Sequence, residues 1–276
     1  MLNNNSITIF EANYSPAAQL EAFADTNAIL ELTNELQQPF LHFWTTTEPT
    51  LILGINDRHL PKLESGLEQL VNQRYQYFLR NSGGLAVISD PGVLNVSLFL
   101  PNRSHPLSVD DAYEVIAELM RQSLPQWQLG TYEITDSYCP GKYDLSINGQ
   151  KIAGIAQRRE KDAIVLMLYM SVFGNQDSRS ETVANFYEVA DAYSQTKWNF
   201  PKVNKSSMTS LVDLDSQFNT LDVMKEKISA IIQHDYSLNQ NSAAILSSEQ
   251  FKQQKARQLR KMILRNEQLP KIGGQH

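Results

Sequence analysis

Short apolar runs along the first two thirds of the chain predict a sheet accompanied by a few helices. Helical spacing of apolar residues from Pro16 to Gln37 predicts a first helix with one apolar stripe. Apolar residues 94, 96, 98 and 100 alternate with residues 95, 97 and 99, which predicts a half-buried strand. The longer apolar run from Ala163 to Phe173 predicts a strand at the centre of the sheet. Further strands are predicted at residues 40–44, 51–55, 75–79 and 85–88.

Three more helices are predicted further along the chain. Ser108 and Asp111 resemble a capping box, which predicts that a helix begins there. Two amphipathic helices are expected near Leu221–Gln233 and Ser248–Asn266. The order of these elements predicts a mixed α/β (α+β) domain over residues 1–205, with a sheet flanked by helices. A small helical C-terminal extension over residues 206–276 is expected to follow it.

A β-hairpin is the clearest local signal in the sequence. Asn148-Gly149 is the strongest two-residue hairpin turn, and it lies between two short runs with alternating apolar residues. With these two residues as the loop, Leu145 pairs with Ile152. Asp144 and Lys151 then lie on the same, polar face of the hairpin. The hairpin therefore brings Lys151 toward the segment that precedes it in the chain.

Composition excludes several classes of protein. The chain has 276 residues and a net charge of −6, which argues against a general nucleic-acid binder. No apolar run is long enough to span a membrane, so no membrane partner is expected. The N-terminus lacks a basic region followed by an apolar one, and a cytoplasmic location is therefore expected. The five histidines are scattered and there is no CxxC or HExxH motif, so no metal site is expected.

Cys139 is the only cysteine of the chain. Pro140 and Gly141 follow it directly, which predicts that the thiol lies on a loop. A loop thiol near a lysine, here Lys151, suits nucleophilic acyl transfer. Free cysteines are also often inert, buried small residues. The residue types alone leave both interpretations open.

Several stretches resemble the biotin and lipoate protein ligase superfamily. The first is Arg80-Asn81-Ser82-Gly83-Gly84-Leu85-Ala86-Val87, followed by Asp90-Pro91-Gly92-Val93-Leu94-Asn95-Val96-Ser97. The lipoyl branch of the superfamily has Arg-Arg-x-Ser-Gly-Gly-Gly-x-Val and then His-Asp-x-Gly-x-Leu-Asn-x-Ser. Residues 143–154 resemble the lysine-bearing hairpin of the same branch. Within that branch, the stretches most similar to the lipoyl amidotransferases are Ser137-Tyr138-Cys139-Pro140-Gly141, 157–159 and 200–211.

The resemblance implies a ligase-like catalytic domain and a specific reaction in lipoate biosynthesis. An octanoyl group would move from a lysine of the glycine cleavage H protein to Cys139 as a thioester. It would then move to a lysine in the lipoyl domain of a 2-oxoacid dehydrogenase acyltransferase subunit, without a cofactor. The resemblance implies Cys139 and Lys151 as catalytic residues, with Lys151 contacting the acyl carbonyl. It also implies substrate-binding residues, namely Arg80, Ser82, Gly83, Gly84, Asn95, Asp144 and Gly154.

Three departures from the pattern bear on the alternatives. Asn81 replaces the second arginine, Leu85 the third glycine, and Ser89 stands where ligases often carry histidine. These changes argue against an ATP-dependent lipoate ligase but do not affect a cysteine transferase. An octanoyltransferase that uses octanoyl-acyl carrier protein, and a non-catalytic acyl-binding module, remain alternatives. Either Lys151 or Asp144 could accept the thiol proton.

Two further expectations concern the surroundings of the site. Apolar walls for the acyl chain are expected from Leu53, Val87 and Ile155, although ordinary core positions have the same residue types. The predicted helix 248–266 carries six basic residues. It could dock an acidic lipoyl-type domain, or it could be a solvated helix face.

Overall fold

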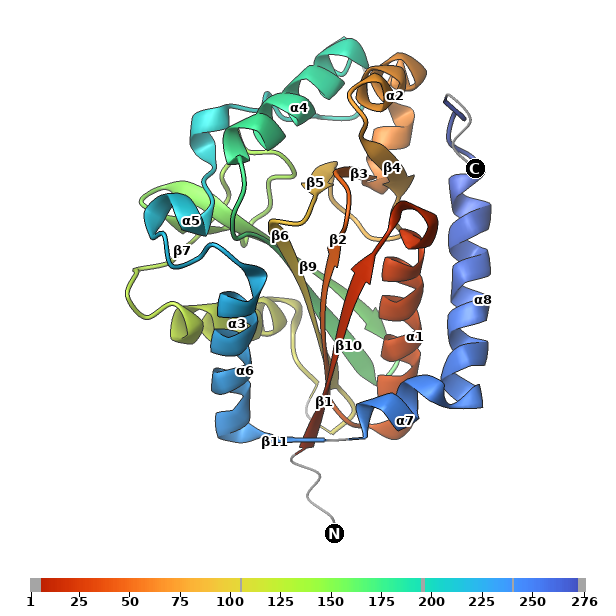
Figure 1. Cartoon of the computed structure of the whole chain (residues 1–276), viewed down its shortest axis with the longest axis vertical. Helices are drawn as coiled ribbons and strands as arrows, with labels where there is room; N and C mark the ends of the chain where they lie inside the picture. The colour runs from red at the N-terminus through yellow and green to blue at the C-terminus, as the bar shows by residue number, and fades with distance from the viewer. Residues whose placement is uncertain (1–5, 105, 195–196, 240, 273–276) are drawn as a thin grey trace.

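A mixed eight-stranded sheet forms the centre of the computed structural model, which describes residues 6–104, 106–194, 197–239 and 241–272 (Figure 1). Neighbouring strands β1 and β2 are parallel, whereas β2, β6, β10 and β9 run antiparallel to one another in turn. In spatial order the strands are β11 (Ser237–Leu238), β1 (Ser6–Tyr14), β2 (Phe40–Thr46), β6 (Val93–Pro101), β10 (Ala163–Ser171), β9 (Gln150–Glu160), β8 (Leu145–Ile147) and β7 (Gly130–Thr131).

A second, three-stranded sheet carries the glycine-rich segment of the sequence. Its central strand β3 (Thr50–Leu53) is parallel to β4 (Gln76–Leu79) and antiparallel to β5 (Val87–Ser89). Arg80 directly follows β4, and the chain then loops through residues 81–86 to reach β5. The small sheet therefore holds both ends of the loop that contains Gly83 and Gly84.

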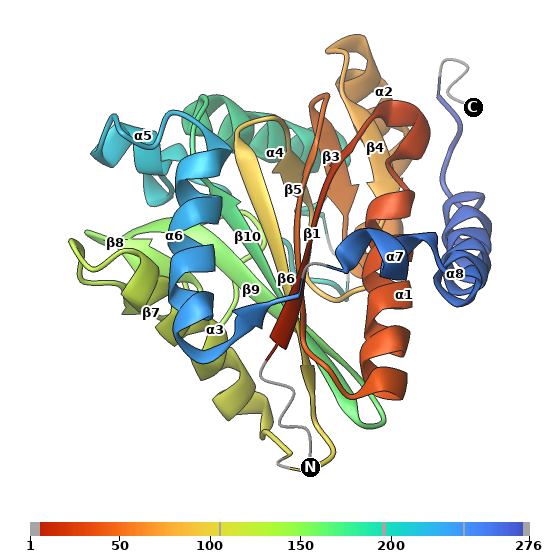
Figure 2. The ribbon, with the colours of Figure 1, turned by 60° about the horizontal axis from the view of Figure 1, so that its bottom comes forward.

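Helices cover both faces of the main sheet. In two views α1 lies against one face with α8 packed along its outer side, and α3 and α6 lie against the other face (Figures 1 and 2). Ser108 caps α3 by accepting a hydrogen bond from the Asp111 amide at 3.0 Å, as the capping box predicts. Within the described residues the α-helices are α1 (Glu21–Leu36), α2 (Leu63–Asn72), α3 (Val109–Ser123), α4 (Gln176–Val189), α5 (Leu211–Leu214), α6 (Leu221–Asp235), α7 (Ser242–Ser247) and α8 (Glu249–Asn266).

The predicted fold class, a mixed sheet flanked by helices, is confirmed, and one detail of burial is wrong. The strand predicted at residues 94–100 is not half-buried, because every residue of β6 from Val93 to Phe99 is buried. Helix α1 covers one face of β6, whereas α3 and α6 cover the other. Asn95 and Ser97 are therefore polar groups inside the molecule, on the face that Phe99 shares with α1.

The C-terminal helices pack closely on the sheet domain. Strand β11 pairs with β1, and α8 lies along α1 with ion pairs from Lys255 to Glu21 at 2.7 Å and to Asp25 at 2.9 Å. Arg257 of α8 also pairs with Glu31 of α1. Part of the basic character of α8 is thus used within the chain. The division of the chain after residue 205 stays a prediction.

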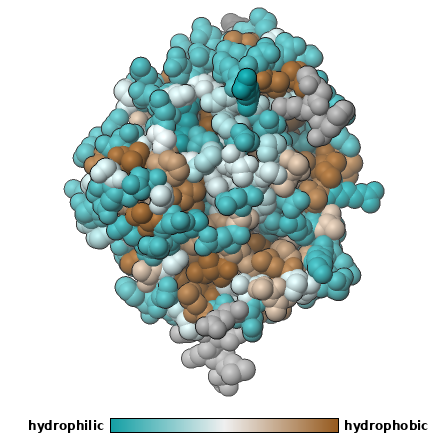
Figure 3. Space-filling model, viewed as in Figure 1, coloured by the Kyte–Doolittle hydropathy of each residue, from teal (hydrophilic) through white to brown (hydrophobic). Residues whose placement is uncertain are grey.

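The surface shown in Figure 3 has hydrophilic and apolar patches side by side. Apolar patches lie over the lower half of this face, where Figure 1 shows β11 and α7. Leu238 and Leu246 belong to these elements and are exposed. Single exposed apolar side chains are usual for folded proteins.

In the part of the chain that the structure describes, no helix is long and apolar enough to cross a membrane.

Candidate active site

A cavity of about 330 Å³ lies at the junction of the two sheets and α1. Apolar and aromatic side chains form much of its wall, including Phe23, Trp44, Met167 and Tyr169. The structure brings all of the site residues named from the sequence to this one cavity, namely Arg80, Ser82, Gly83, Gly84, Asn95, Cys139, Asp144, Lys151 and Gly154.

The sulfur of Cys139 faces the glycine-rich loop. Cys139 lies between β7 and β8, outside regular secondary structure, and its φ of 47° is in the left-handed region. Its Sγ accepts a hydrogen bond from the Leu85 amide at 3.2 Å and from the Arg80 guanidinium at 3.6 Å. These two N–H donors fix the position of the sulfur beside the loop. Cys139 is half-buried rather than fully buried, and its reactivity stays a prediction.

Tyr138 anchors the loop beside the sulfur. Its side chain is fully buried, and its hydroxyl lies 2.5 Å from the hydroxyl of Tyr169, which lines the cavity. Ser137 donates from its side chain to the Ile134 carbonyl at 2.7 Å. The residues on the N-terminal side of Cys139 are therefore fixed to the core.

Lys151 holds the backbone of the Cys139 loop. Its ammonium donates to the carbonyls of Cys139 at 2.8 Å and Tyr138 at 3.1 Å, and to the Ser137 hydroxyl at 3.2 Å. The side chain is only 2% exposed, so Lys151 is a buried lysine, although it lies beside a turn. The hairpin places Lys151 near Cys139, as predicted, but the contact is with the carbonyl oxygen rather than with the sulfur.

Asp144 neutralises Lys151 and ties together the two ends of the same loop. Its Oδ1 lies 3.0 Å from the Lys151 ammonium, and its Oδ2 accepts from the Ile134 amide at 3.2 Å and the Gly141 amide at 3.1 Å. Burial raises the pKa of the Asp144 carboxyl, while the Lys151 charge and these hydrogen bonds oppose the rise. Both carboxylate oxygens already have partners, which suits a structural carboxylate better than a free base.

The register of the hairpin differs from the prediction at one position. The Asn148-Gly149 turn forms as expected, with φ values of 52° and 81°. Lys151 lies opposite Ser146, but Leu145 lies opposite Ala153 instead of Ile152. A β-bulge between Leu145 and Ser146 causes this shift, because one strand has an extra residue at that point.

Arg80 and the glycines shape the loop above the sulfur. The Arg80 side chain donates to the carbonyls of Gly83 and Leu85, both at 2.9 Å, and the residue is 7% exposed. Gly84 has a φ of 87°, and a Cβ there would lie 2.8 Å from the Cys139 sulfur. Glycine is therefore required where the loop approaches the thiol. At Gly83 an added Cβ would meet no atom within 4 Å.

Two of the three residues expected to form acyl walls line the cavity. Val87 and Ile155 line the cavity, but Leu53 does not, and its neighbour Ile52 does. Because successive side chains of a strand point to opposite faces, Leu53 packs into the core behind the cavity. Helix α1 contributes Phe23 and Thr26 to the lining, which the sequence pattern does not indicate.

Comparison with known proteins identifies the family. Residues 19–233 match the model of the lipoyl protein ligase A/B catalytic domain. The chain belongs to this family. Among its relatives, an octanoyl-GcvH:protein N-octanoyltransferase of Lysinibacillus sphaericus is 38% identical over 198 residues, covering 71% of each chain. A relative with the same name from an Exiguobacterium species is 35% identical, and the match covers 96% of this chain and 90% of that relative.

A further relative is named for the transfer of a lipoyl group instead of an octanoyl group. The lipoyl-GcvH:protein N-lipoyltransferase of Listeria monocytogenes is 38% identical over 197 residues, covering 71% of each chain. Among solved structures, lipoate-protein ligase A bound with ATP superposes with a TM-score of 0.68 at 17% identity, covering 93% of this chain and 94% of that one. A bipartite lipoate protein ligase from Thermoplasma acidophilum gives 0.65 at 18% identity, covering 96% and 97%. At such identities the likeness shows the fold alone.

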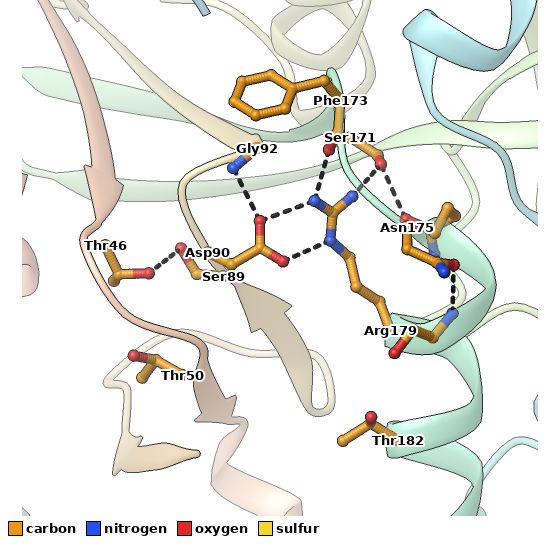
Figure 4. A network of polar contacts seen from close by, with 12 residues as sticks. Thr46, Thr50, Ser89, Asp90, Gly92, Ser171, Phe173, Asn175, Arg179 and Thr182 are labelled. Carbon is orange, nitrogen blue, oxygen red and sulfur yellow. Dashed lines mark hydrogen bonds and ion pairs between the residues drawn. The ribbon is translucent and has the colours of Figure 1, made fainter. Parts of the chain in front are cut away.

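In this member of the lipoyl protein ligase A/B family, the stretch that begins at Asp90 has a structural role. The Asp90 carboxylate receives two hydrogen bonds of 2.7 Å from the Arg179 guanidinium and one of 2.8 Å from the Gly92 amide (Figure 4). Arg179 also donates to the Ser171 hydroxyl and the Phe173 carbonyl. This network fixes the turn between β5 and β6, and thereby the start of the strand that carries Asn95.

Proposed function

We propose that this chain transfers an octanoyl group from the glycine cleavage H protein to lipoyl domains of 2-oxoacid dehydrogenase acyltransferase subunits, through a thioester on Cys139. The observation that carries the proposal is the position of the Cys139 sulfur, which borders the cavity and accepts a hydrogen bond from the Leu85 amide at 3.2 Å. The names of the relatives, octanoyl-GcvH:protein N-octanoyltransferase, support both the donor and the transferred group.

In the first step the sulfur attacks the carbonyl carbon of the octanoyl-lysine amide. A C–S bond forms, the C–N bond breaks, and the thiol proton ends on the departing lysine amine. The thiolate is the reactive nucleophile, and the N–H donors of Leu85 and Arg80 favour it. No co-reactant is needed, because thiol and amide give thioester and amine.

In the second step the amine of an acceptor lysine attacks the thioester. The C–S bond breaks, a new amide forms, and the amine proton returns to the sulfur. One amide replaces another over the whole cycle, so the overall free-energy change is small and no ATP is consumed. The thioester is higher in energy than either amide, so the site must keep water away from it. The apolar walls of the cavity suit this requirement.

Lys151 is the second proposed catalytic residue. Its ammonium borders the cavity and lies 2.8 Å from the carbonyl oxygen of Cys139. An acyl carbonyl bound beside Cys139 would share this positive charge as its oxygen becomes negative. A donor to such an oxyanion contributes about 3–4 kcal/mol in well-studied enzymes. Lys151 thus combines support of the loop with stabilisation of the transition state.

The cavity offers an apolar environment for an eight-carbon chain. Phe23, Trp44, Val87, Ile155 and Met167 are among its lining residues. Each buried methylene contributes about 0.8 kcal/mol, so the six methylenes of octanoate give about 5 kcal/mol. The remaining residues named from the sequence are proposed to line and shape this binding site, namely Arg80, Ser82, Gly83, Gly84, Asn95, Asp144 and Gly154.

A lipoyl group is a second candidate for the transferred group. The Listeria monocytogenes relative, named as a lipoyl-GcvH:protein N-lipoyltransferase, favours it at 38% identity. The chemistry at the carbonyl carbon is the same for both groups. The difference lies in the far end of the acyl chain, which would reach into the apolar part of the cavity.

A comparison of four acyl donors, each supplied separately, tests the function. The protein is mixed with an apo lipoyl domain and one of four donors: octanoyl-H protein, lipoyl-H protein, octanoyl-acyl carrier protein, or free octanoate with ATP. The mass of the lipoyl domain reports transfer. We expect rapid octanoylation from the H protein without ATP. Transfer only from the carrier protein, or only with ATP, would contradict the proposed donor, and transfer from none would support a non-catalytic module.

A further inference from the structure

Asp57 is a buried carboxylic acid beside the glycine-rich loop. The proposed chemistry does not use it. It lies in the 3₁₀ helix Ile55–His59, next to Gly54 at its start, and it is 0% exposed. Its Oδ2 accepts a hydrogen bond of 2.7 Å from the Gly54 amide, and its Oδ1 accepts one of 2.9 Å from the Tyr187 hydroxyl. Burying a carboxylic acid costs free energy unless its oxygens are hydrogen-bonded, and both oxygens of Asp57 have a donor.

Tyr187 connects Asp57 to the loop. It projects from α4, it is fully buried, and its hydroxyl accepts a hydrogen bond of 3.1 Å from the Ala86 amide while donating to Asp57. Ala86 directly follows Leu85, whose amide donates to the Cys139 sulfur. A continuous chain of hydrogen bonds therefore leads from Asp57 through Tyr187 to the peptide beside the donor on sulfur.

The loop is confined on its other sides as well. A Cβ on Gly54 would lie 2.0 Å from the Gly84 carbonyl oxygen, so the loop presses directly on the Gly54 backbone. The Arg80 guanidinium holds the Gly83 and Leu85 carbonyls from the side of the cavity. The Tyr187 hydroxyl holds the Ala86 amide at 3.1 Å, and the Asp57 carboxylate interacts with the same amide, so both side chains set the direction of the neighbouring Leu85 amide.

We propose that Asp57 and Tyr187 are positioning residues that keep the Leu85 N–H directed at the Cys139 sulfur and so make the thiolate available. The proposal rests on the proposed function only in taking Cys139 as the nucleophile. The two side chains touch neither sulfur nor acyl group, and they act through the Ala86–Leu85 backbone. The charged and titratable groups that face Asp57 and Tyr187 are Arg80 and Cys139. Arg58 and His59 of the same 3₁₀ helix are exposed to solvent.

The main test is the alkylation rate of Cys139 by iodoacetamide between pH 6 and 9. Tyr187→Phe keeps the ring and removes the hydroxyl. We expect alkylation at pH 7 to slow about tenfold, because the Ala86 amide loses its tyrosine partner and the Leu85 N–H is no longer held toward the sulfur, a change about the size of one net hydrogen bond. At pH 9 the rate should approach that of the parent protein, since excess base forms the thiolate there. In transfer assays kcat should fall while KM stays unchanged, because the acyl pocket is intact.

Tyr193→Phe is the matched control. It removes another tyrosine hydroxyl, one that donates to the Pro201 carbonyl at 3.1 Å and does not contact the loop. Its alkylation profile should equal that of the parent protein. Equal slowing in both tyrosine variants, or an unchanged alkylation profile in Tyr187→Phe, would overturn the proposal and leave Tyr187 a purely structural residue.

Asp57→Asn gives an independent arm if Tyr187→Phe folds poorly. Gly54 and Tyr187 donate to different oxygens of Asp57, so the NH2 group of asparagine must face one of these two donors, and alkylation should also slow at pH 7. The double variant should be no slower than Tyr187→Phe, because both residues act through one hydrogen-bond chain. Fully additive effects would refute the chain. Alkylation needs no acyl donor, so a failure of the proposed function remains distinguishable.

Discussion

At the residue scale, Lys151 and Asp144 form one buried ion pair that holds the loop around Cys139. Lys151 holds the carbonyls of Tyr138 and Cys139, and Asp144 holds the amides of Ile134 and Gly141. Both side chains are at most 2% exposed. Water cannot replace a lost partner at such burial, so each charge depends on the other.

Lys151→Met is therefore expected to destabilise the protein by about 3–5 kcal/mol at pH 7. Burial raises the pKa of Asp144, so its protonated form is favoured in the folded chain once Lys151 is gone. The stability that protonation provides is lost as the pH rises through that raised pKa. The loss should therefore be smaller at pH 4 than at pH 7, as urea unfolding at both values can measure.

The double variant Lys151→Met/Asp144→Leu serves as the control for this pair. Replacing both charges by apolar groups should restore part of the stability, because no unpaired charge is left. Transfer activity should stay low, since the cation beside the acyl carbonyl is missing. A single variant as stable as the parent at pH 7 would contradict the coupling.

Single residues also mark the limit of sequence-based inference. Motifs identify Arg80, Cys139 and Lys151 as members of one site because their residue types and spacing are specific. They do not reveal that the Lys151 ammonium meets the Cys139 carbonyl at 2.8 Å. Asp57 and Tyr187 are 130 positions apart and belong to no shared pattern, so only the fold brings them together.

At the element scale, helix α8 stabilises the strand that leads to the site. Asn266, at its end, accepts from the Leu79 amide at 2.7 Å and donates to the Leu79 carbonyl at 3.0 Å. Leu79 is the last residue of β4, an outer strand of the small sheet, and Arg80 follows it. The asparagine side chain thus takes the place of a neighbouring strand at this edge.

Asn266→Ala is expected to lower the free energy of unfolding by about 1–3 kcal/mol, because two backbone groups lose their partner. Transfer should slow several-fold, since the Arg80 backbone is less well fixed. Thermal unfolding and the transfer assay measure the two effects. Gln268→Ala, at an exposed position two residues further on, should change neither. Equal behaviour of the two variants would exclude this role of α8.

The longer helices with an apolar stripe were predictable, whereas the short α2, whose buried residues are Gly66, Leu67 and Leu70, was missed despite its apolar stripe. The sequence pattern gives α1, α3, α6 and α8 within a few residues. It does not indicate α4, whose buried side chains include Gln176, Arg179, Ser180 and Thr182. It also gives α1 a single buried stripe, although α8 covers the opposite side of that helix. The β-bulge in the hairpin leaves no residue signal, so the register of Leu145 could not be foreseen.

At the scale of the whole molecule, burial of His42 makes stability depend on pH. Burial lowers the pKa of His42 to about 3, with a smaller contribution from the Lys255 charge. Its ordinary value is about 6.5. Between these values the unfolded chain binds a proton that the folded chain does not. His42 therefore contributes stability above pH 6.5 that is lost as the pH falls.

His42→Leu should flatten this dependence. Between pH 6 and pH 4 the free energy of unfolding of the parent protein is expected to fall faster than that of the variant, by about 1.4 kcal/mol per pH unit. Urea unfolding across this range measures the difference. His234→Leu, at an exposed position of α6, should follow the parent curve. A parallel curve for His42→Leu would show that His42 is protonated in the folded protein.

The covalent intermediate on Cys139 is the central claim, and intact mass spectrometry tests it most directly. The protein is mixed with octanoyl-H protein without ATP or acceptor, quenched in acid within seconds, and digested to locate any adduct. We expect one octanoyl group on the peptide that contains Cys139, released by hydroxylamine and absent in Cys139→Ser, which should retain the thermal stability of the parent protein. An adduct on a lysine, or transfer that persists in Cys139→Ser, would contradict the account.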